Sequence, residues 1–120
     1  MKIKNIVAGF GLSLAALGAM AQANTPGLDQ RQANQERRIQ QGAESGSLTE
    51  REINRLKHGQ DRVERIEDRA KADGTVTPRE RARLQHAEDV QSQRIYQQKH
   101  DRQHDFNHNG RVDRPRRAVR

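Results

Sequence analysis

The sequence predicts an all-α protein: an elongated antiparallel helical hairpin with a third helix laid along it, followed by a loop and a basic C-terminal tail. Gln, Glu, Arg and Ala dominate the middle of the chain and favour helices, and no alternation of β-branched residues typical of a strand occurs there. The apolar residues recur at helical spacing. Two short phrases that contain glycine also carry the signals of helix starts.

The first 23 residues have the pattern of a secretory signal peptide. Lys2 and Lys4 form a basic start, residues 6–20 are mostly apolar, and the sequence A-Q-A at 21–23 offers a cleavage site. The apolar run is too short to cross a bilayer, which takes about 20 residues. We therefore expect an exported protein, periplasmic or extracellular, without stable membrane insertion after cleavage.

Residues 24–120 are poor in core-forming side chains. Leu, Ile, Val and Phe make up 14 of these 97 residues, below the level of about 20% at which disorder becomes a concern. There is no Cys, so disulfides do not contribute. Such a chain cannot build a large core with a deep pocket. Its three serines, Ser45, Ser47 and Ser92, lie in no nucleophile motif. We expect no enzyme activity.

The basic charge is concentrated at the C-terminus. Loss of Lys2 and Lys4 with the signal peptide lowers the net charge from +7 to +5, and five arginines against one acid, Asp113, stand in the last ten residues. This tail is either a solvated end or a docking element for anionic envelope components. Export argues against nucleic acid as the partner.

The chain divides into the signal peptide (1–23), a helical domain with two capped helix starts (24–104), and a loop with an Arg-rich tail (105–120). The connections between the expected helices are short, which makes neighbouring helices antiparallel. We expect three helices, at residues 29–44, 50–71 and 78–103.

One short phrase occurs three times: GSLTERE at 46–52, GTVTPRE at 74–80 and GRVDRPR at 110–116. Each copy runs Gly, any residue, an aliphatic residue, then Thr or Asp. The pattern is typical of a glycine turn that leads into a capped helix, and also of the second half of an EF-hand calcium loop.

The first two copies favour capped helices. Thr49 with Glu52, and Thr77 with Glu80, have the spacing of a capping box, in which each side chain bonds to the other residue's backbone amide. Pro78 fits the first helical position, where its missing amide costs nothing. At positions one and three of a calcium loop the second copy would have Arg69 and Lys71, which cannot bind a cation, and the first copy would have Gln41 and Ala43.

The third copy extends upstream into the EF-hand pattern D-x-N-x-N-G, which starts at Asp105. Oxygen-bearing residues alternate there because such a loop curls around its ion. The twelfth position, where an EF-hand has a bidentate Glu, is Arg116. We expect a weak calcium site, and a simple Asn-Gly turn is the alternative. The candidate ligands are the side chains of Asp105, Asn107, Asn109 and Asp113 and the carbonyl of Arg111.

His100 and His104 suggest a second metal site. Two His four residues apart share a face of a helix and can chelate zinc or copper. The alternative is that basic residues at a helix C-terminus complement the helix dipole.

The apolar stripes of the predicted helices are narrow. They resemble the seam of a coiled coil more than the face of a core helix. A seam of this width is hard to bury within one chain, which favours a homodimer. The seam residues are Ile53, Leu56, Val63, Ile66, Leu84 and Ile95, with Ala87 and Gln91 on the same face of the third helix.

The sequences DQRQANQ at 29–35 and KHD at 99–101, with the two Thr-containing phrases, resemble a set of small exported proteobacterial proteins. That resemblance implies export and an all-helical fold, and no activity. LTERE at 48–52 and VTPRE at 76–80 are similar to the L-T-x-x-Q motifs of Spy/CpxP-type periplasmic stress chaperones, with Glu in place of Gln.

Two functions remain open from the sequence. The first is a non-enzymatic exported protein that binds divalent cations through its C-terminal segment. The alternative is a chaperone-like or scaffolding protein that holds client proteins or anionic envelope components.

Overall fold

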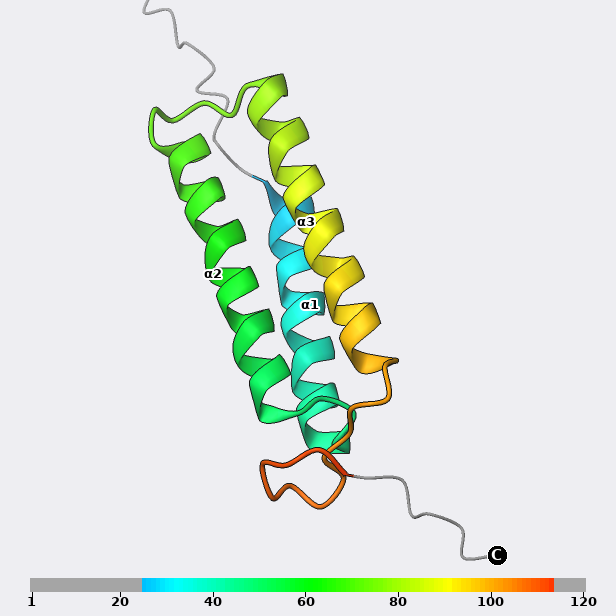
Figure 1. The fold of residues 1–120 in the computed structure, drawn as a ribbon. Coiled ribbons are helices and arrows are strands. Elements are labelled where there is room, and N and C mark those ends of the chain that lie inside the picture. Colours follow the sequence, from blue (N-terminus) through cyan, green and yellow to red (C-terminus); the bar gives the residue numbers. More distant parts are fainter. Residues whose placement is uncertain (1–24, 114–120) are drawn as a thin grey trace, which may run out of the picture.

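The structure, a computed structural model, describes residues 25–113, and three α-helices form most of this part (Figure 1). They are α1 (Pro26–Ser45), α2 (Glu50–Lys71) and α3 (Pro78–Lys99). Successive helices run in opposite directions and all three lie side by side (Figure 1). The predicted all-α class and the hairpin with a third helix along it are confirmed. The predicted signal peptide and the tail from residue 114 lie outside the described residues.

Both predicted capping boxes are present. At the start of α2, the amide of Thr49 donates to Glu52 Oε2 (2.8 Å), and the amide of Glu52 donates to Thr49 Oγ1 (3.4 Å). Thr77 and Glu80 make the same two bonds at the start of α3, at 2.9 and 3.2 Å. These bonds satisfy amides that the first helical turn leaves without partners. They fix both helix starts at the predicted residues.

Three helix boundaries differ from the sequence prediction, one of them, the end of α1 at Ser45 rather than 44, by a single residue. α1 begins at Pro26 rather than residue 29, because proline suits the first helical position. α3 ends at Lys99 rather than 103. Asp101 accepts a hydrogen bond from the amide of Gln103 (2.7 Å), and such a local bond competes with helix continuation.

The interior contains two apolar clusters with polar side chains between them. Because residues along a helix rise by about 1.5 Å each, these clusters lie toward opposite ends of the bundle. One consists of Ile39, Leu48, Leu56 and Ile95, with Ile53 against it; the other consists of Leu28, Ala70 and Leu84, with Ile66 and Val76 against it.

The seam is better covered than expected. Leu84 and Ile95 are fully buried, and Leu56 and Val63 are almost so, all within one chain. The prediction that one chain would bury this seam poorly was therefore wrong for these four of its six residues, whereas Ile53 and Ile66 are half-buried. This seam does not require a second chain.

Candidate functional site

The segment after α3 folds back beneath the connection between α1 and α2 (Figure 1). Asp105 donates its amide to the carbonyl oxygen of Gly46 at 2.8 Å. A Cβ on Gly46 would lie 2.5 Å from the carbonyl oxygen of Asp105 and 2.6 Å from the Cα of Phe106. Only glycine permits this approach, and it also has the left-handed φ of 72°. The first glycine phrase thus positions the segment that contains the third.

The side-chain oxygens of residues 105, 107 and 109 all accept backbone amides of the same loop. Asp105 uses both carboxylate oxygens, one for the amide of Asn109 (3.0 Å) and one for that of Gly110 (2.8 Å). Asn107 also accepts from Asn109 (3.1 Å), and Asn109 accepts from Arg111 (2.8 Å). His108 and Gly110 have left-handed φ values of 55° and 76°. Together these bonds and left-handed residues curl the chain around its own side-chain oxygens.

Asp113 closes the loop. Its amide donates to the carbonyl oxygen of His104 at 2.7 Å. Its carboxylate accepts from the amide of Phe106 and from Asn107 Nδ2, both at 2.7 Å. The carboxylate of Asp113 therefore lies beside the amide side chain of Asn107, although six residues separate them. Four of the predicted ligand side chains are brought together in one loop.

Glu50 is a neighbour of this loop that sequence reasoning missed. A Cβ on Gly110 would lie 3.3 Å from Glu50 Oε2, so the first residue of α2 extends its carboxylate over the loop glycine. No local sequence signal connects residues 50 and 110. The contact exists because the loop docks against the start of α2.

The remaining predicted ligands stand in a different arrangement. His100 follows the end of α3, so the prediction that His100 and His104 share a helix face was wrong. His100 stacks on Tyr96, and its Nδ1 lies 2.7 Å from the carbonyl oxygen of Tyr96. His104 stacks on Phe106, and its Nδ1 is buried without a hydrogen-bond partner. Arg111 is exposed, and Arg116 lies outside the described residues.

Within residues 25–113, no three His, Asp or Glu side chains gather closely enough to form a metal site by themselves. The loop instead combines two carboxylates, Asp105 and Asp113, with the amide side chains of Asn107 and Asn109. Such mixed oxygen sets suit calcium, which takes six to eight oxygen ligands, and not the nitrogen- and sulfur-rich sites of zinc.

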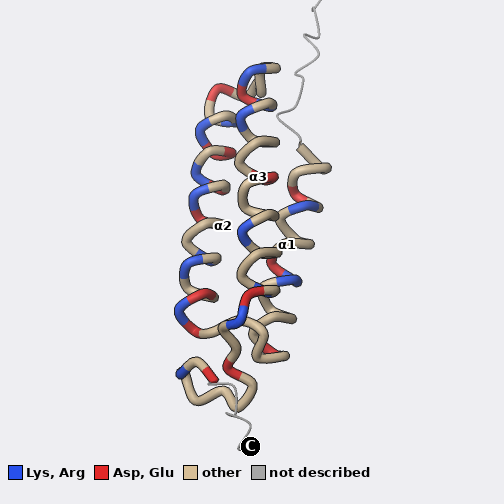
Figure 2. Tube along the Cα trace, turned by 45° about the vertical axis from the view of Figure 1, so that its right-hand side comes forward, with Lys and Arg blue, Asp and Glu red and all other residues tan. Residues whose placement is uncertain are grey.

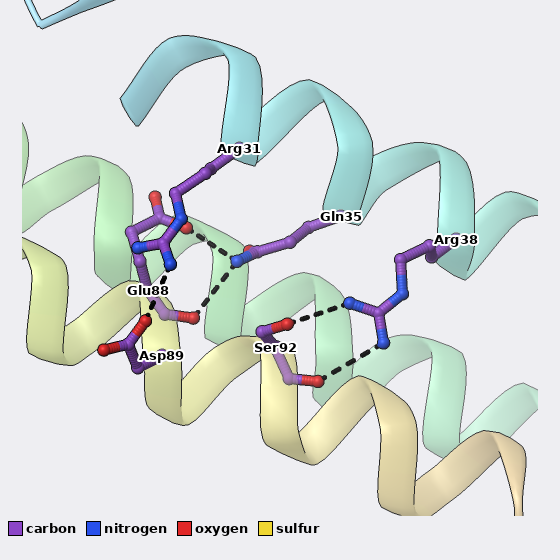
Figure 3. Close-up of polar contacts among 6 residues, drawn as sticks. All are labelled: Arg31, Gln35, Arg38, Glu88, Asp89 and Ser92. Atoms are coloured by element: carbon purple, nitrogen blue, oxygen red, sulfur yellow. Dashed lines mark hydrogen bonds and ion pairs between the residues drawn. The ribbon is translucent and has the colours of Figure 1, made fainter. Parts of the chain in front are cut away.

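A second polar region lies inside the bundle, between the two apolar clusters. Glu88 on α3 is fully buried, and Gln35 on α1 donates to its carboxylate (2.6 Å) and to its backbone carbonyl (3.1 Å) (Figure 3). Arg31 pairs with Asp89, and Arg38 donates to Ser92, on the more exposed side of the same helix pair (Figure 3). Sequence periodicity placed Ala87 rather than Glu88 on the buried face.

Burial raises the pKa of Glu88, and bonds from Gln32 and Gln35 only partly oppose it. Burial would raise the pKa of Glu67 as well, but hydrogen bonds from Lys71, Thr25 and Gln32 hold it below its ordinary value. The pKa values of these two interior glutamates, which lie on neighbouring helices, are therefore shifted in opposite directions. Because the pKa of Glu67 is lowered in the folded protein, its contribution to folding stability is lost as the pH falls through that value.

None of the helices in residues 25–113 has the length and apolar character needed to cross a membrane. Comparisons with protein-family models, with curated proteins and with solved structures found no match to this chain.

Proposed function

We propose that this is a non-enzymatic exported protein that binds a divalent cation, calcium in preference to others, in the loop at residues 105–113. One observation carries the proposal: the carboxylate of Asp113 accepts a hydrogen bond from Asn107 Nδ2, while the side-chain oxygens of Asp105 and Asn109 accept amides of the same loop. A D-x-N-x-N-G sequence is thus combined with a closed loop that already holds its oxygens together. Preorganised ligands lower the entropic cost of binding.

The existing hydrogen bonds are compatible with a bound ion. Each carboxylate oxygen has two lone pairs, so Asp105 can accept the amides of Asn109 and Gly110 and still face a cation. The amides help to orient the carboxylate, in the way that outer-shell partners orient metal ligands.

The charge of the site favours weak binding. Two loop carboxylates, Asp105 and Asp113, stand where strong EF-hands have more, and Arg111 lies among them. Glu50 adds a third carboxylate from outside the loop and stands close to Gly110. We expect a dissociation constant of about 10⁻⁴ to 10⁻³ M, the range of extracellular calcium modules.

Titration calorimetry with calcium tests the proposal. Asp105→Asn and Asp113→Asn each keep the shape of the side chain and remove one charge, so each should weaken calcium binding at least about tenfold. Asp73→Asn is the matched control, because Asp73 likewise accepts a loop amide, that of Thr75 (3.0 Å), in the turn before α3. Asp73 stands directly before the second copy (74–80) and far along the chain from residues 105–113, so Asp73→Asn should leave calcium binding unchanged.

Glu50→Gln should weaken binding by a smaller factor if the outside carboxylate contributes. Parallel titrations with zinc and copper, using His104→Ala, separate the two metal classes. Binding of zinc or copper that depends on His104, with no response to calcium, would overturn the proposal.

A further inference from the structure

The two sides of α2 differ in charge. Arg55, Arg62 and Arg69 repeat every seven residues, close to two helical turns, and so lie along one edge of the helix. The exposed acids of the helix fall at other phases, and Lys71, on the side facing α1, contacts Asp29 and Glu67. These exposed acids are Glu50, Asp61, Glu64 and Asp68.

The arginine edge of α2 faces a matching edge of α3 across a groove. One hollow of about 190 Å³ is rimmed by Arg62, His86 and Arg94. A second hollow along the same helix pair is rimmed by Arg69 and Arg83. The groove floor is formed by Val63, Ile66, Ala70, Ala87 and Val90, of which Ile66, Ala87 and Val90 are half-buried.

The cations of this groove lack acidic partners in the described part of the chain. No carboxylate of residues 25–113 lies within ion-pair distance of Arg62, Arg69, Arg83 or Arg94. Glu80 is the one carboxylate that lines the described hollows, and it caps α3 through Thr77. By contrast, on the α1 side Arg31 pairs with Asp89. Figure 2 shows basic positions recurring along α2 and α3.

We propose that the α2–α3 groove binds an acidic amphipathic helix of a partner protein. Two antiparallel helices present a groove that a further helix fills in a four-helix bundle. The apolar stripe of such a helix would cover Ile66, Ala87 and Val90. Glu or Asp at its flanking heptad positions would meet the arginines, whose seven-residue repeat matches that spacing.

Other occupants fit less well. A second copy of this chain would bring the same arginine-lined edges together, at a net charge of +5 for each chain once Lys2 and Lys4 are removed with the signal peptide. Residues 114–120 contain four arginines and no acid, so this tail is repelled as well. A bilayer surface is flat on this scale and would contact the arginine rims without reaching the half-buried floor between the helices.

The test uses the purified protein, a labelled peptide and fluorescence anisotropy at low salt. The peptide has about three heptads, with Leu at a and d and Glu at e and g. An isomer with the same composition but no apolar stripe tests the floor of the groove. Arg62→Glu with Arg94→Glu reverses the rim, and Arg37→Glu with Lys57→Glu makes the same charge change at exposed positions outside it.

The rim variant should lose at least about tenfold in peptide affinity, since two attractive pairs become repulsive. The control variant should stay within about twofold of the parent protein, and the isomer should bind more weakly than the peptide. Equal losses in both variants would show general charge attraction and overturn the proposal. So would binding of phosphatidylglycerol vesicles, but not of the peptide, that depends on Arg62 and Arg94. Circular dichroism of both variants verifies that they fold.

Discussion

The second and third copies of the glycine phrase share a pattern and differ in structure. At 74–80, Thr77 and Glu80 bond to each other's amides and start α3. At 110–113, Asp113 stands at the position of Thr77 but bonds backwards, to Phe106 and Asn107. One phrase begins a helix, and the other closes a loop.

The residues before the glycine explain the difference. Arg69 and Lys71 precede Gly74 and are still part of α2, and Asp73 accepts a single loop amide there, that of Thr75. Asp105 and Asn107 precede Gly110, and their oxygens accept the amides of the following residues. The glycine permits the turn in both copies, and the residues upstream decide what the turn encloses.

The largest expected effect concerns the loop position that lacks a ligand. Arg116→Glu restores a carboxylate at the twelfth position and removes a positive charge, so calcium affinity should rise from the millimolar toward the micromolar range, up to about a thousandfold. Calorimetry measures the change. The equivalent substitution in the second copy does not exist, because its twelfth position is already Glu80. No gain in Arg116→Glu would mean that the third copy is only a turn.

The second-largest expected effect is a difference in stability loss between substitutions of Gly46, in the first copy, and of Gly74, in the second. Gly46 and Gly74 both have left-handed φ values, 72° and 81°, but only Gly46 touches the C-terminal loop. Gly46→Ala should destabilise the protein by about 3 kcal/mol, through backbone strain and displacement of Asp105. Gly74→Ala should cost only about 1 kcal/mol, the strain alone. Urea unfolding compares them, and equal losses would contradict the docking described for the loop.

A third prediction concerns the two capping boxes. Thr77 is exposed, and Thr77→Ala should cost about 1 kcal/mol. Thr49 is 5% exposed, so Thr49→Ala should cost about 2 kcal/mol, because it also leaves buried groups without partners. Both losses should be the same with and without calcium. A loss that appears only with calcium would identify the affected copy as a binding loop.

The smallest expected effect is on the pH dependence of stability, through the buried carboxyl group of Glu52. Burial raises the pKa of Glu52, the bonds from Thr49 oppose this, and Asp101 raises it further. A raised pKa in the folded state means that the stabilising contribution is complete below the ordinary value of 4.5 and is lost as the pH rises through the folded value. Glu52→Gln should therefore reduce the stability difference between pH 5 and pH 7. An unchanged difference in urea unfolding would contradict the burial argument.

The helix starts could be predicted from the sequence because their signals are local. Thr49 and Thr77 each find their partner three residues away, so the spacing alone determines the bonds. The end of α3 could not be predicted in this way. No Gly or Pro stands between Lys99 and Asp105, and the bond from Gln103 to Asp101 that competes with the helix is one of several that the sequence permits.

The interior was harder to predict for a different reason. Periodicity assigns apolar residues to the buried face, so it predicted that Ala87 rather than Glu88 would be buried. Glu88 can be buried only because Gln35, on another helix, donates to it. The proximity of Glu50 to Gly110 and the hydrogen bond between Asp105 and Gly46 are also tertiary. The sequence of a single segment therefore cannot predict them.

The most direct test follows the amide resonances of Gly46, Gly74 and Gly110 by ¹H–¹⁵N NMR as calcium is added. The Gly110 amide donates to Asp105 Oδ2 at 2.8 Å, so a cation on that carboxylate should shift its resonance strongly. Gly74, in the capped helix start, should not move, and Gly46 should respond only through its contact with the loop. A large shift at Gly110 saturating near millimolar calcium is the predicted result. No shift at Gly110, or equal shifts at Gly74 and Gly110, would contradict the account.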